Sequence, residues 1–466
     1  MGEIVPESKT GREPEGSADW AADVRSRIYG LALLCGLVAG GVGSAFHYLC
    51  DLIGRWRTEF LATGRLPLRL DPGGALEYWA GLTLGGRIAA LGAVLALVLA
   101  LARLLVRRCA PEAAGSGIQE IEGFLDGQRP LRWLRVLPVK FVGGVLAIGS
   151  GLVLGREGPT VHMGGASGMG LGRLFDCSRG ELNTLVAAGA GAGLAAAFNA
   201  PLAGVVFVME EMRREVRYSF RGYHAVIIAC FAATFVTERV AGVGPQLALP
   251  PVDPALSTYP LFAALGIVLG VAGVAFNRGL LVLLDLLAAW SRQAGWLLVP
   301  ALGVGLAALL LLAPAAAGGG EQIVDPQRLG ALELQALAVL LLLRTVTTFV
   351  SYAAGTPGGV FAPMLALGAI VGLLATRLAR PYLPDLPVDE TGLAIAGMAG
   401  LFTATVRAPL TAIILISELT GGFGMALATT LTCATASLTA EWLKGRPLYE
   451  QLLERTLRRA GEVGKA

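Results

Sequence analysis

Charged residues are scarce in this chain of 466 residues. They make up 15% of the sequence, whereas a soluble domain carries about 25%. Hydrophobic residues account for 55%, the mean hydropathy is +0.65, and no stretch is left that could fold as a sizeable water-soluble domain. The composition therefore predicts a membrane protein and makes a soluble enzyme a poor interpretation.

Histidines and paired cysteines are also few. The three histidines lie in separate segments, and the six cysteines include no Cys-x-x-Cys pair, so we expect no bound metal and no redox site. The net charge is only +3, and no run of like charges indicates a nucleic-acid surface. We therefore expect neither a cofactor nor a nucleic-acid partner.

The first 24 residues lack the apolar core of a cleaved signal peptide. Arg25 and Arg27 stand directly before the first apolar stretch, which places segment 1–24 in the cytoplasm by the positive-inside rule. A second basic cluster supports this orientation, and arginines that follow the first stretch weaken it. The cluster is Arg213, Arg214, Arg217 and Arg221, and the opposing residues are Arg55, Arg57, Arg65 and Arg69.

Long apolar stretches predict membrane-spanning helices, since each approaches or exceeds the roughly 20 residues that cross the hydrocarbon. They cover residues 29–53, 84–106, 259–290, 296–316 and 332–352. Shorter pieces interrupted by glycine or proline lie between them, at residues 136–154, 158–175, 182–198, 201–212, 361–378 and 409–420. Several of these pieces are too short to cross a membrane alone. The pattern predicts an all-α protein that contains broken helices.

Two short motifs occur twice in the same order. The first is Asn199-Ala200-Pro201-Leu202 with Glu210, repeated as Arg407-Ala408-Pro409-Leu410 with Glu418. The second is Pro159, Gly164 and Gly168, repeated as Pro363, Gly368 and Gly372. Short segments at corresponding places in two halves are typical of transporters built from inverted repeats. The motifs alone do not distinguish parallel from inverted repeats. We expect the equivalent residues Glu210 and Glu418 to pair with each other across the two repeats.

Three glycine-rich loops each precede a new apolar segment. A helix that begins there leaves its first N–H groups without partners, and such ends attract anions. Several of them meeting inside a membrane would bind an anion without a full positive charge. The loops are Gly115-Ser116-Gly117-Ile118-Gln119-Glu120, Gly155-Arg156-Glu157-Gly158-Pro159 and Gly358-Gly359-Val360-Phe361-Ala362-Pro363.

These loops resemble the three signature loops of the CLC chloride channels and chloride/proton exchangers, with Gln119 in place of the usual proline. The resemblance runs from about Tyr29 to Tyr449 and is greatest to the bacterial exchangers. It implies a CLC-type bundle of two inverted-topology repeats with tilted and broken helices, placed at 25–242 and 258–449 within a transmembrane domain at 25–449. Residues 450–466 are expected to form a short cytoplasmic tail without CBS domains. A bacterial inner membrane and cytoplasmic termini are implied as well.

The resemblance also implies a chloride site. Its ligands would be the hydroxyls of Ser116 and Tyr449 and the backbone N–H groups of Val360 and Phe361. Taken alone, Ser116 would be a helix N-cap and Tyr449 an interfacial aromatic residue. The surrounding selectivity-loop backbone would come from Gly115, Gly117, Ile118, Gly155, Arg156, Gly158, Pro159, Gly359, Ala362 and Pro363.

Two glutamates are candidates for gating and proton transfer. Glu157 precedes the helix expected at Pro159, where the dipoles that attract chloride also attract a carboxylate. Once protonated, it would lose that attraction and swing away, as the family glutamate does. Glu211 matches a second glutamate that exchangers carry and channels usually replace. The alternative for Glu157 is a first-turn carboxylate paired with Arg156. The alternative for Glu211 is a surface carboxylate paired with Arg213 or Arg214.

The resemblance implies an H⁺/Cl⁻ antiporter, not an enzyme, that works as a homodimer in the lipid bilayer with chloride and protons as its only substrates. Ser116 favours chloride over fluoride or nitrate. One alternative is a passive voltage- or pH-gated chloride channel of the same family. A remote alternative is an intramembrane serine protease, because Gly165, Ala166, Ser167 and Gly168 form a Gly-x-Ser-Gly motif. That chemistry needs a base, and His224 is the only later histidine.

Overall fold

A computed structural model describes residues 16–63, 81–212, 220–247, 252–320, 332–383 and 389–463, together with positions 79, 249 and 387. Every regular element in these residues is a helix, as predicted. Seven of the helices are long and apolar enough to cross a membrane. The chain is therefore a multi-pass, all-α membrane protein.

The helices fall into two consecutive groups. The first contains α1 (Gly16–Thr63), α3 (Leu84–Cys109), η1 (Pro111–Ala113), α4 (Ile118–Leu125), α5 (Trp133–Gly149), α6 (Glu157–Leu174), α7 (Arg179–Phe198), α8 (Pro201–Glu211) and α9 (Phe220–Ala241). The second contains η2 (Leu256–Thr258), α10 (Tyr259–Leu312), η3 (Pro314–Ala316), α12 (Leu334–Ala353), α13 (Phe361–Ala379), α14 (Glu390–Val406), α15 (Pro409–Thr420), α16 (Ala426–Trp442) and α17 (Leu448–Val463).

One predicted boundary is wrong. The stretches predicted at 259–290 and 296–316 belong largely to one helix, α10, because the polar residues between them do not break a helix and only Pro300 interrupts its sequence. The segment predicted as a tail at 450–466 is helical through Val463, as part of α17. Residues 1–15 and 464–466 lie outside the described residues.

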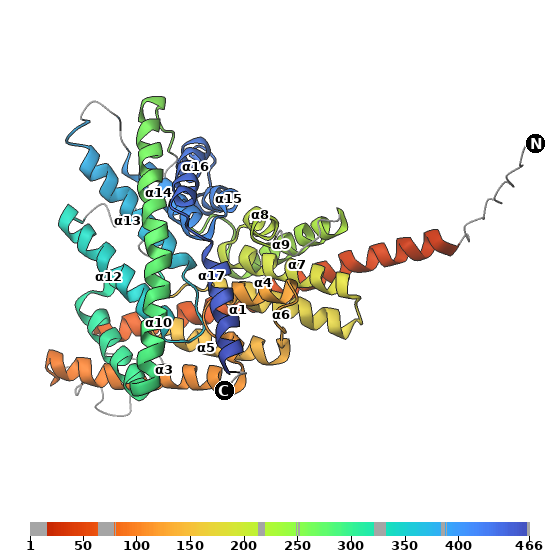
Figure 1. Cartoon of the computed structure of the whole chain (residues 1–466), viewed down its shortest axis with the longest axis horizontal. Coiled ribbons are helices and arrows are strands. Elements are labelled where there is room, and N and C mark those ends of the chain that lie inside the picture. The colour runs from red at the N-terminus through yellow and green to blue at the C-terminus, as the bar shows by residue number, and fades with distance from the viewer. Residues whose placement is uncertain are drawn as a thin grey trace, which may run out of the picture.

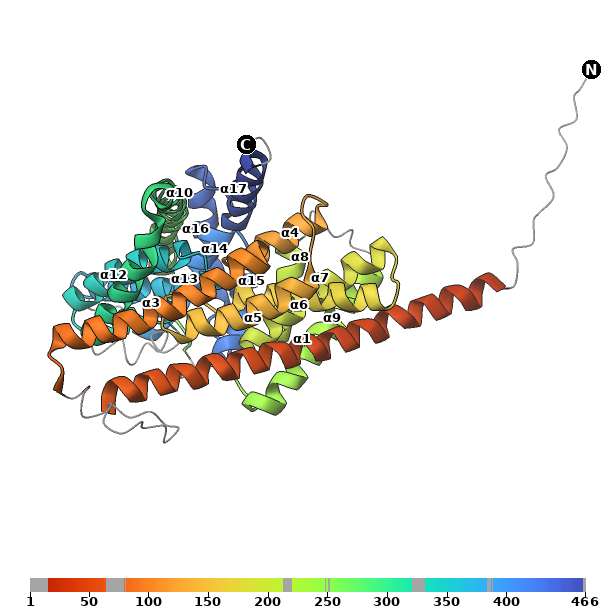
Figure 2. The ribbon, with the colours of Figure 1, turned by 90° about the horizontal axis from the view of Figure 1, so that it is seen from below.

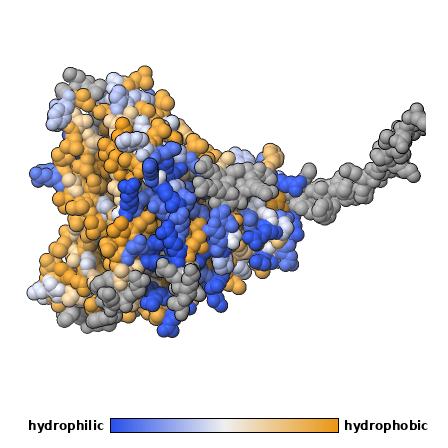
Figure 3. Space-filling model, in the orientation of Figure 1, coloured by the Kyte–Doolittle hydropathy of each residue, from blue (hydrophilic) through white to orange (hydrophobic). Residues whose placement is uncertain are grey.

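The other helices lie on either side of α17. Figure 1 shows α10 and α12 on one side, α7, α8 and α9 on the other, and α17 between them. In Figure 2, α1 follows one edge of the molecule, beside α5 and α6, and α17 lies at the opposite edge. Figure 3 shows hydrophilic residues gathered over the position of α17, with hydrophobic surface over α10 and α12. The face seen in Figure 3 is thus polar over α17 and apolar over α10 and α12.

Glycines bring α6 against α7. A Cβ added to Gly164 would lie 2.1 Å from the carbonyl oxygen of Gly189, and one added to Gly189 would lie 2.2 Å from that of Gly164. The same contact recurs between α13 and α14, where Gly368 and Gly397 meet each other's carbonyl oxygens at 2.3 and 2.2 Å. Close approach through small residues is how helices pack where lipid offers no hydrophobic driving force. The repeated glycines of the sequence therefore serve the same purpose in both halves.

Two glutamates each cap the N-terminus of the helix that carries the other. The Glu418 carboxylate, on α15, accepts hydrogen bonds from the backbone N–H groups of Leu202 (3.1 Å) and Ala203 (2.8 Å), at the start of α8. The Glu210 carboxylate, on α8, accepts from the N–H groups of Leu410 (3.0 Å) and Thr411 (2.7 Å), at the start of α15. The expected pairing of Glu210 with Glu418 is confirmed in this indirect form. Each carboxylate satisfies donors that lipid cannot.

We predict that Gly164→Ala destabilises the protein by about 1–3 kcal/mol, the usual cost of overpacking, because the new methyl group meets backbone rather than a movable side chain. Thermal unfolding in detergent measures this effect. The control is Gly41→Ala on α1, where an added Cβ has nothing within 4 Å. Equal melting temperatures for both variants would contradict the close α6–α7 contact.

We also predict that Glu418→Ala lowers the free energy of unfolding by about 2 kcal/mol, since it strands the N–H donors of α8. Glu333→Ala is the control, because the Glu333 side chain is exposed and makes no cap hydrogen bond. Unfolding curves for the two variants in the same detergent make the comparison. If Glu418→Ala is as stable as Glu333→Ala, the cap contributes nothing.

Candidate anion site

The three glycine-rich loops are joined by backbone hydrogen bonds. Gly115 donates to the Thr356 carbonyl (3.0 Å) and accepts from the Gly358 N–H group (3.0 Å). Gly155 and Gly359 exchange a second pair of hydrogen bonds, at 2.7 and 2.8 Å. The third loop thus connects the first to the second. As a result, the starts of α4, α6 and α13 meet at one place, as the sequence predicted.

The first loop turns at Gly117, the N-cap of α4. Its φ of +93° lies in the left-handed region that glycine adopts without strain. A Cβ at this position would also lie 2.2 Å from Nδ1 of His162 on α6. The Gln119 side chain folds back so that its Oε1 accepts a hydrogen bond from the Gly117 N–H group (3.1 Å). The turn therefore forms with glutamine in place of the usual proline.

Ser116 and Tyr449 bring two hydroxyl groups to the loops. Both side chains are fully buried, and neither hydroxyl has a hydrogen-bond partner among the described residues. The two hydroxyls nevertheless face each other closely enough to interact directly, although they do not form a hydrogen bond of normal geometry. A Cβ at Gly158, in the first turn of α6, would lie 2.2 Å from Ser116 Oγ. Such unsatisfied hydroxyls are costly and need a ligand or a water molecule.

Tyr449 reaches the loops from the N-terminal end of α17. Ion pairs on the polar face hold this helix: Arg455 bonds Asp285 of α10 at 2.8 Å, and Arg446 bonds Glu454. Hydrogen bonding from Arg446 also holds the pKa of the Glu454 carboxyl below its usual value. The position of the Tyr449 hydroxyl therefore depends on contacts well outside the buried site.

Val360 and Phe361 begin α13, and both are fully buried. Their backbone N–H groups make no hydrogen bond within the described part of the chain. The Phe361 ring packs between Phe198 and Phe402, with ring centroids 5.2 and 4.4 Å away. The aromatic contacts fix this end of α13, so that its unsatisfied donors stay directed at the junction of the loops.

Glu157 is the first residue of α6 and is 1% exposed. Its carboxylate reaches across to α13 and accepts a hydrogen bond from the Ala362 N–H group (3.3 Å). A Cβ at Gly155 would lie 2.1 Å from Glu157 Oε2, so the glycine makes room for this conformation. Arg156, the partner in the alternative interpretation of Glu157, forms an ion pair with Asp51 (2.9 Å). The carboxylate sits at a helix N-terminus, as an anion would.

Glu211 ends α8 and is half-buried. It lies within electrostatic range of Tyr449, whereas its neighbour Glu210 turns to α15. The alternative of pairing with Arg213 or Arg214 falls outside the described residues, as does Arg217. The structure therefore gives the two adjacent glutamates different surroundings.

One buried residue of the site escaped the sequence analysis. The Tyr352 hydroxyl, on α12, accepts a hydrogen bond from the Ser116 N–H group (3.5 Å), and a Cβ at Gly115 would lie 2.8 Å from it. In the sequence Tyr352 only marks the end of an apolar stretch. No motif or spacing indicated the contact, because it joins positions 236 residues apart.

The serine protease alternative is wrong for this structure. The Ser167 hydroxyl donates to the Met163 carbonyl (2.9 Å) on its own helix, and His224 Nδ1 contacts the Phe220 carbonyl (2.7 Å) on α9.

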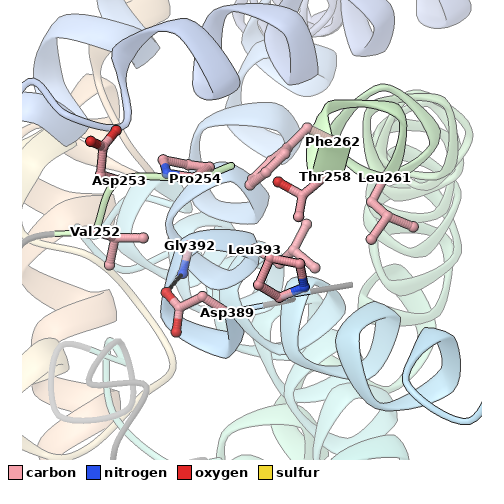
Figure 4. Close-up of a pocket in the computed structure, with 10 residues that line it drawn as sticks. Val252, Asp253, Pro254, Thr258, Leu261, Phe262, Asp389, Gly392 and Leu393 are labelled. Atoms are coloured by element: carbon pink, nitrogen blue, oxygen red, sulfur yellow. Dashed lines mark hydrogen bonds between the residues drawn. The ribbon is translucent and has the colours of Figure 1, made fainter. Parts of the chain in front are cut away.

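A hollow of about 40 Å³ lies away from the loops, between the segment before α10 and the start of α14. Figure 4 shows it lined by Val252, Phe262 and Asp389. None of the predicted site residues lines this hollow.

Known proteins share this architecture. A family model described as "Voltage gated chloride channel" matches residues 97–441. The chain belongs to the voltage-gated chloride channel (CLC) family. Among its CLC relatives, the H(+)/Cl(-) exchange transporter ClcA of Vibrio cholerae is 43% identical over 433 residues, covering 92% of this chain and 89% of the relative. The protein of the same name from Salmonella typhi is 42% identical, covering 79% of this chain and 78% of the relative.

Solved CLC structures have the same fold as this chain. A slow cyanobacterial Cl⁻/H⁺ antiporter superposes with a TM-score of 0.83 at 36% identity, covering 93% of this chain and 98% of the other. A CLC-type fluoride/proton antiporter has a TM-score of 0.68 at 20% identity, covering 89% and 95%. The second likeness concerns the fold alone. The predicted resemblance to the CLC family is confirmed.

Proposed function

We propose that this CLC protein exchanges chloride for protons across a membrane. The observation that carries the proposal is the junction of the loops, where buried hydroxyls and helix N-termini without partners surround one place. Its relatives in Vibrio and Salmonella are named as exchangers of the same two ions. Every group of the site comes from one polypeptide.

In this proposal chloride binds between the hydroxyls of Ser116 and Tyr449 and the N–H groups of Val360 and Phe361. All four are neutral donors, so the ion is attracted without being trapped by a full opposite charge. The selectivity-loop glycines, with Ile118, Arg156, Pro159, Ala362 and Pro363, set the positions of these donors. The tyrosine arrives on α17 and the others on the loops, so the two sides of the site can separate.

Glu157 acts as the gate and carries the proton at the outer side of the ion. Its carboxylate already accepts from the Ala362 N–H group, next to the Val360 and Phe361 donors, so it competes with chloride for the same helix N-terminus. Protonation removes the negative charge that holds it there, and the side chain then leaves the path to the anion. The same event therefore loads a proton and admits chloride.

Glu211 provides the cytoplasmic entry for protons. A proton must reach Glu157 without passing through the bound anion, and a second ionisable group inside a membrane protein is the usual means. Its half-buried place at the end of α8, apart from the loops, suits that task. The termini would then lie in the cytoplasm of a cell whose inner membrane holds the protein.

The protein would work as a homodimer with one ion path in each subunit. Large apolar side chains are exposed on four neighbouring helices of one chain, where a second copy or lipid must cover them. They are Leu202 on α8, Phe231 and Phe235 on α9, Leu410 on α15, and Leu427 and Leu438 on α16. Because each chain holds a complete site, the dimer is not needed to build it.

We predict that Ser116→Ala and Tyr449→Phe each weaken chloride binding about 2- to 12-fold, the equivalent of one neutral hydrogen bond of ~0.5–1.5 kcal/mol. Titration calorimetry on the purified protein measures the dissociation constant. Tyr382→Phe is the control, because Tyr382 is 84% exposed. Unchanged affinity in both site variants would remove the two hydroxyls from the site.

The deciding experiment records chloride and pH together in liposomes that contain the wild-type protein. A chloride gradient should drive protons uphill. Glu157→Gln should keep chloride movement and lose proton movement, because a neutral side chain cannot cycle a proton. Glu211→Gln should also keep chloride movement and lose proton movement, because protons then have no entry from the cytoplasmic side. Glu333→Gln, altered at an exposed position, should stay coupled. Chloride flux without uphill protons in the wild type would make the protein a channel.

A further inference from the structure

Two basic side chains are completely buried in the bundle, Lys140 on α5 and Arg344 on α12. They are 204 residues apart, which is the separation of Pro159 from Pro363 and of Gly164 from Gly368 in the repeated motif. The cations therefore occupy equivalent positions in the two halves. A buried charge is costly in any protein and more so in a membrane, so its presence in both halves calls for a physical reason.

Lys140 is attached to the first glycine-rich loop. Its Nζ donates to the carbonyl oxygens of Ala113 (3.1 Å) and Gly115 (2.8 Å). Gly115 directly precedes Ser116, and the same glycine is hydrogen-bonded to the third loop. The lysine charge thus lies next to the backbone that carries the Ser116 hydroxyl.

Arg344 is attached to the equivalent segment of the second half. Its guanidinium donates to the carbonyl oxygens of Ala315 (2.9 Å), Ala317 (3.3 Å) and Gly318 (3.0 Å). The Gly318 N–H group in turn donates to the Gly151 carbonyl (2.9 Å), in the stretch that leads to Glu157. η1 and η3, the short helices beside the two cations, begin at Pro111 and Pro314 and repeat the same arrangement.

Neither cation is neutralised by a carboxylate within the described residues. All their recorded hydrogen bonds go to backbone carbonyls, and no ion pair includes them. Glu120 interacts with Lys140 through space, but its carboxylate bonds Arg129 at 2.9 Å. An arginine keeps its proton in proteins. Arg344 therefore holds a positive charge in the interior, and Lys140 adds a second one when it is protonated; neither side chain bonds a carboxylate within the described residues.

We propose that Lys140 and Arg344 are a symmetric pair of electrostatic positioning residues, one from each half, whose charges hold the anion at the junction of the loops. The inference rests on the proposed function, since it takes the anion to be the ion that is transported. The two charges lie outside the ring of neutral donors, so they raise affinity without touching the ion. Their field acts through low-dielectric surroundings, where water does not screen it.

This role differs in a measurable way from that of the hydroxyls. A distant charge acts on any monovalent anion alike, whereas a hydroxyl in contact discriminates among anions by size and hydrogen bonding. Loss of either charge should therefore weaken chloride, bromide and nitrate by one common factor. A merely structural role, in which the side chains only tie down carbonyls, would instead depend on hydrogen-bond geometry and would not follow the charge.

The test measures dissociation constants for the three anions by titration calorimetry on the purified full-length chain. We expect Lys140→Met and Arg344→Met each to weaken all three anions roughly tenfold, the order expected on removal of one partly screened unit charge at about 10 Å. Lys140→Arg and Arg344→Lys should recover most of the affinity, because they restore the charge with different geometry. Arg278→Met is the matched control, since the exposed Arg278 also bonds only a backbone carbonyl, that of Leu443.

The outcomes separate the two proposals. If the wild type binds no chloride, the proposed function fails. If the wild type binds chloride but folded Lys140→Met and Arg344→Met proteins bind it equally well, the charge pair is overturned. An equal loss in the charge-retaining variants, or a loss confined to one anion, also overturns it in favour of a structural role. Should a methionine variant fail to fold, Lys140→Gln and Arg344→Gln, which keep a donor for the carbonyls, carry the same comparison.

Discussion

A helix broken inside a membrane must find hydrogen-bond partners within the protein, because lipid supplies none. This constraint organises the whole molecule. The loops before α4, α6 and α13 satisfy one another through Gly115, Gly155 and Gly359, and the starts of α8 and α15 are satisfied by glutamates exchanged between them. The Val360 and Phe361 N–H groups, at the start of α13, make no hydrogen bond within the described residues. Donors left unpaired at such a helix N-terminus are of the kind that attract an anion.

The outline of the fold was readable because its signals are local. Apolar length located most helices, and a proline near the beginning of an apolar piece located several of their starts, so Pro159, Pro201 and Pro409 lie in the first turns of α6, α8 and α15. The internal repeat marked Gly164 and Gly368, which lie at close helix contacts in the two halves. The three loops sufficed for the family, because their order along the chain is itself specific.

Other features lay beyond the sequence because they depend on contacts between distant segments. The Tyr352 hydroxyl meets the Ser116 N–H group across 236 positions, and nothing near Tyr352 announces this. The continuity of α10 was missed because a polar stretch reads as a loop, although polarity alone does not break a helix. Glu210 and Glu418 were expected to pair, but the sequence did not show how. Each carboxylate caps the helix that carries the other, and this arrangement requires α8 and α15 to lie antiparallel.

The bridges between the loops also limit how this chain can change in length. The third loop is bonded to the first at Gly115 and to the second at Gly155, so one inserted residue would put both ladders out of register. The connection between α9 and α10 is hydrogen-bonded to the rest of the chain as well, from Leu247 to Leu419, Gly244 to Asn199 and Gln246 to Ala197. The loops at the junction should therefore keep their length through any redesign, and fusion tags, labels or circular permutation should avoid them.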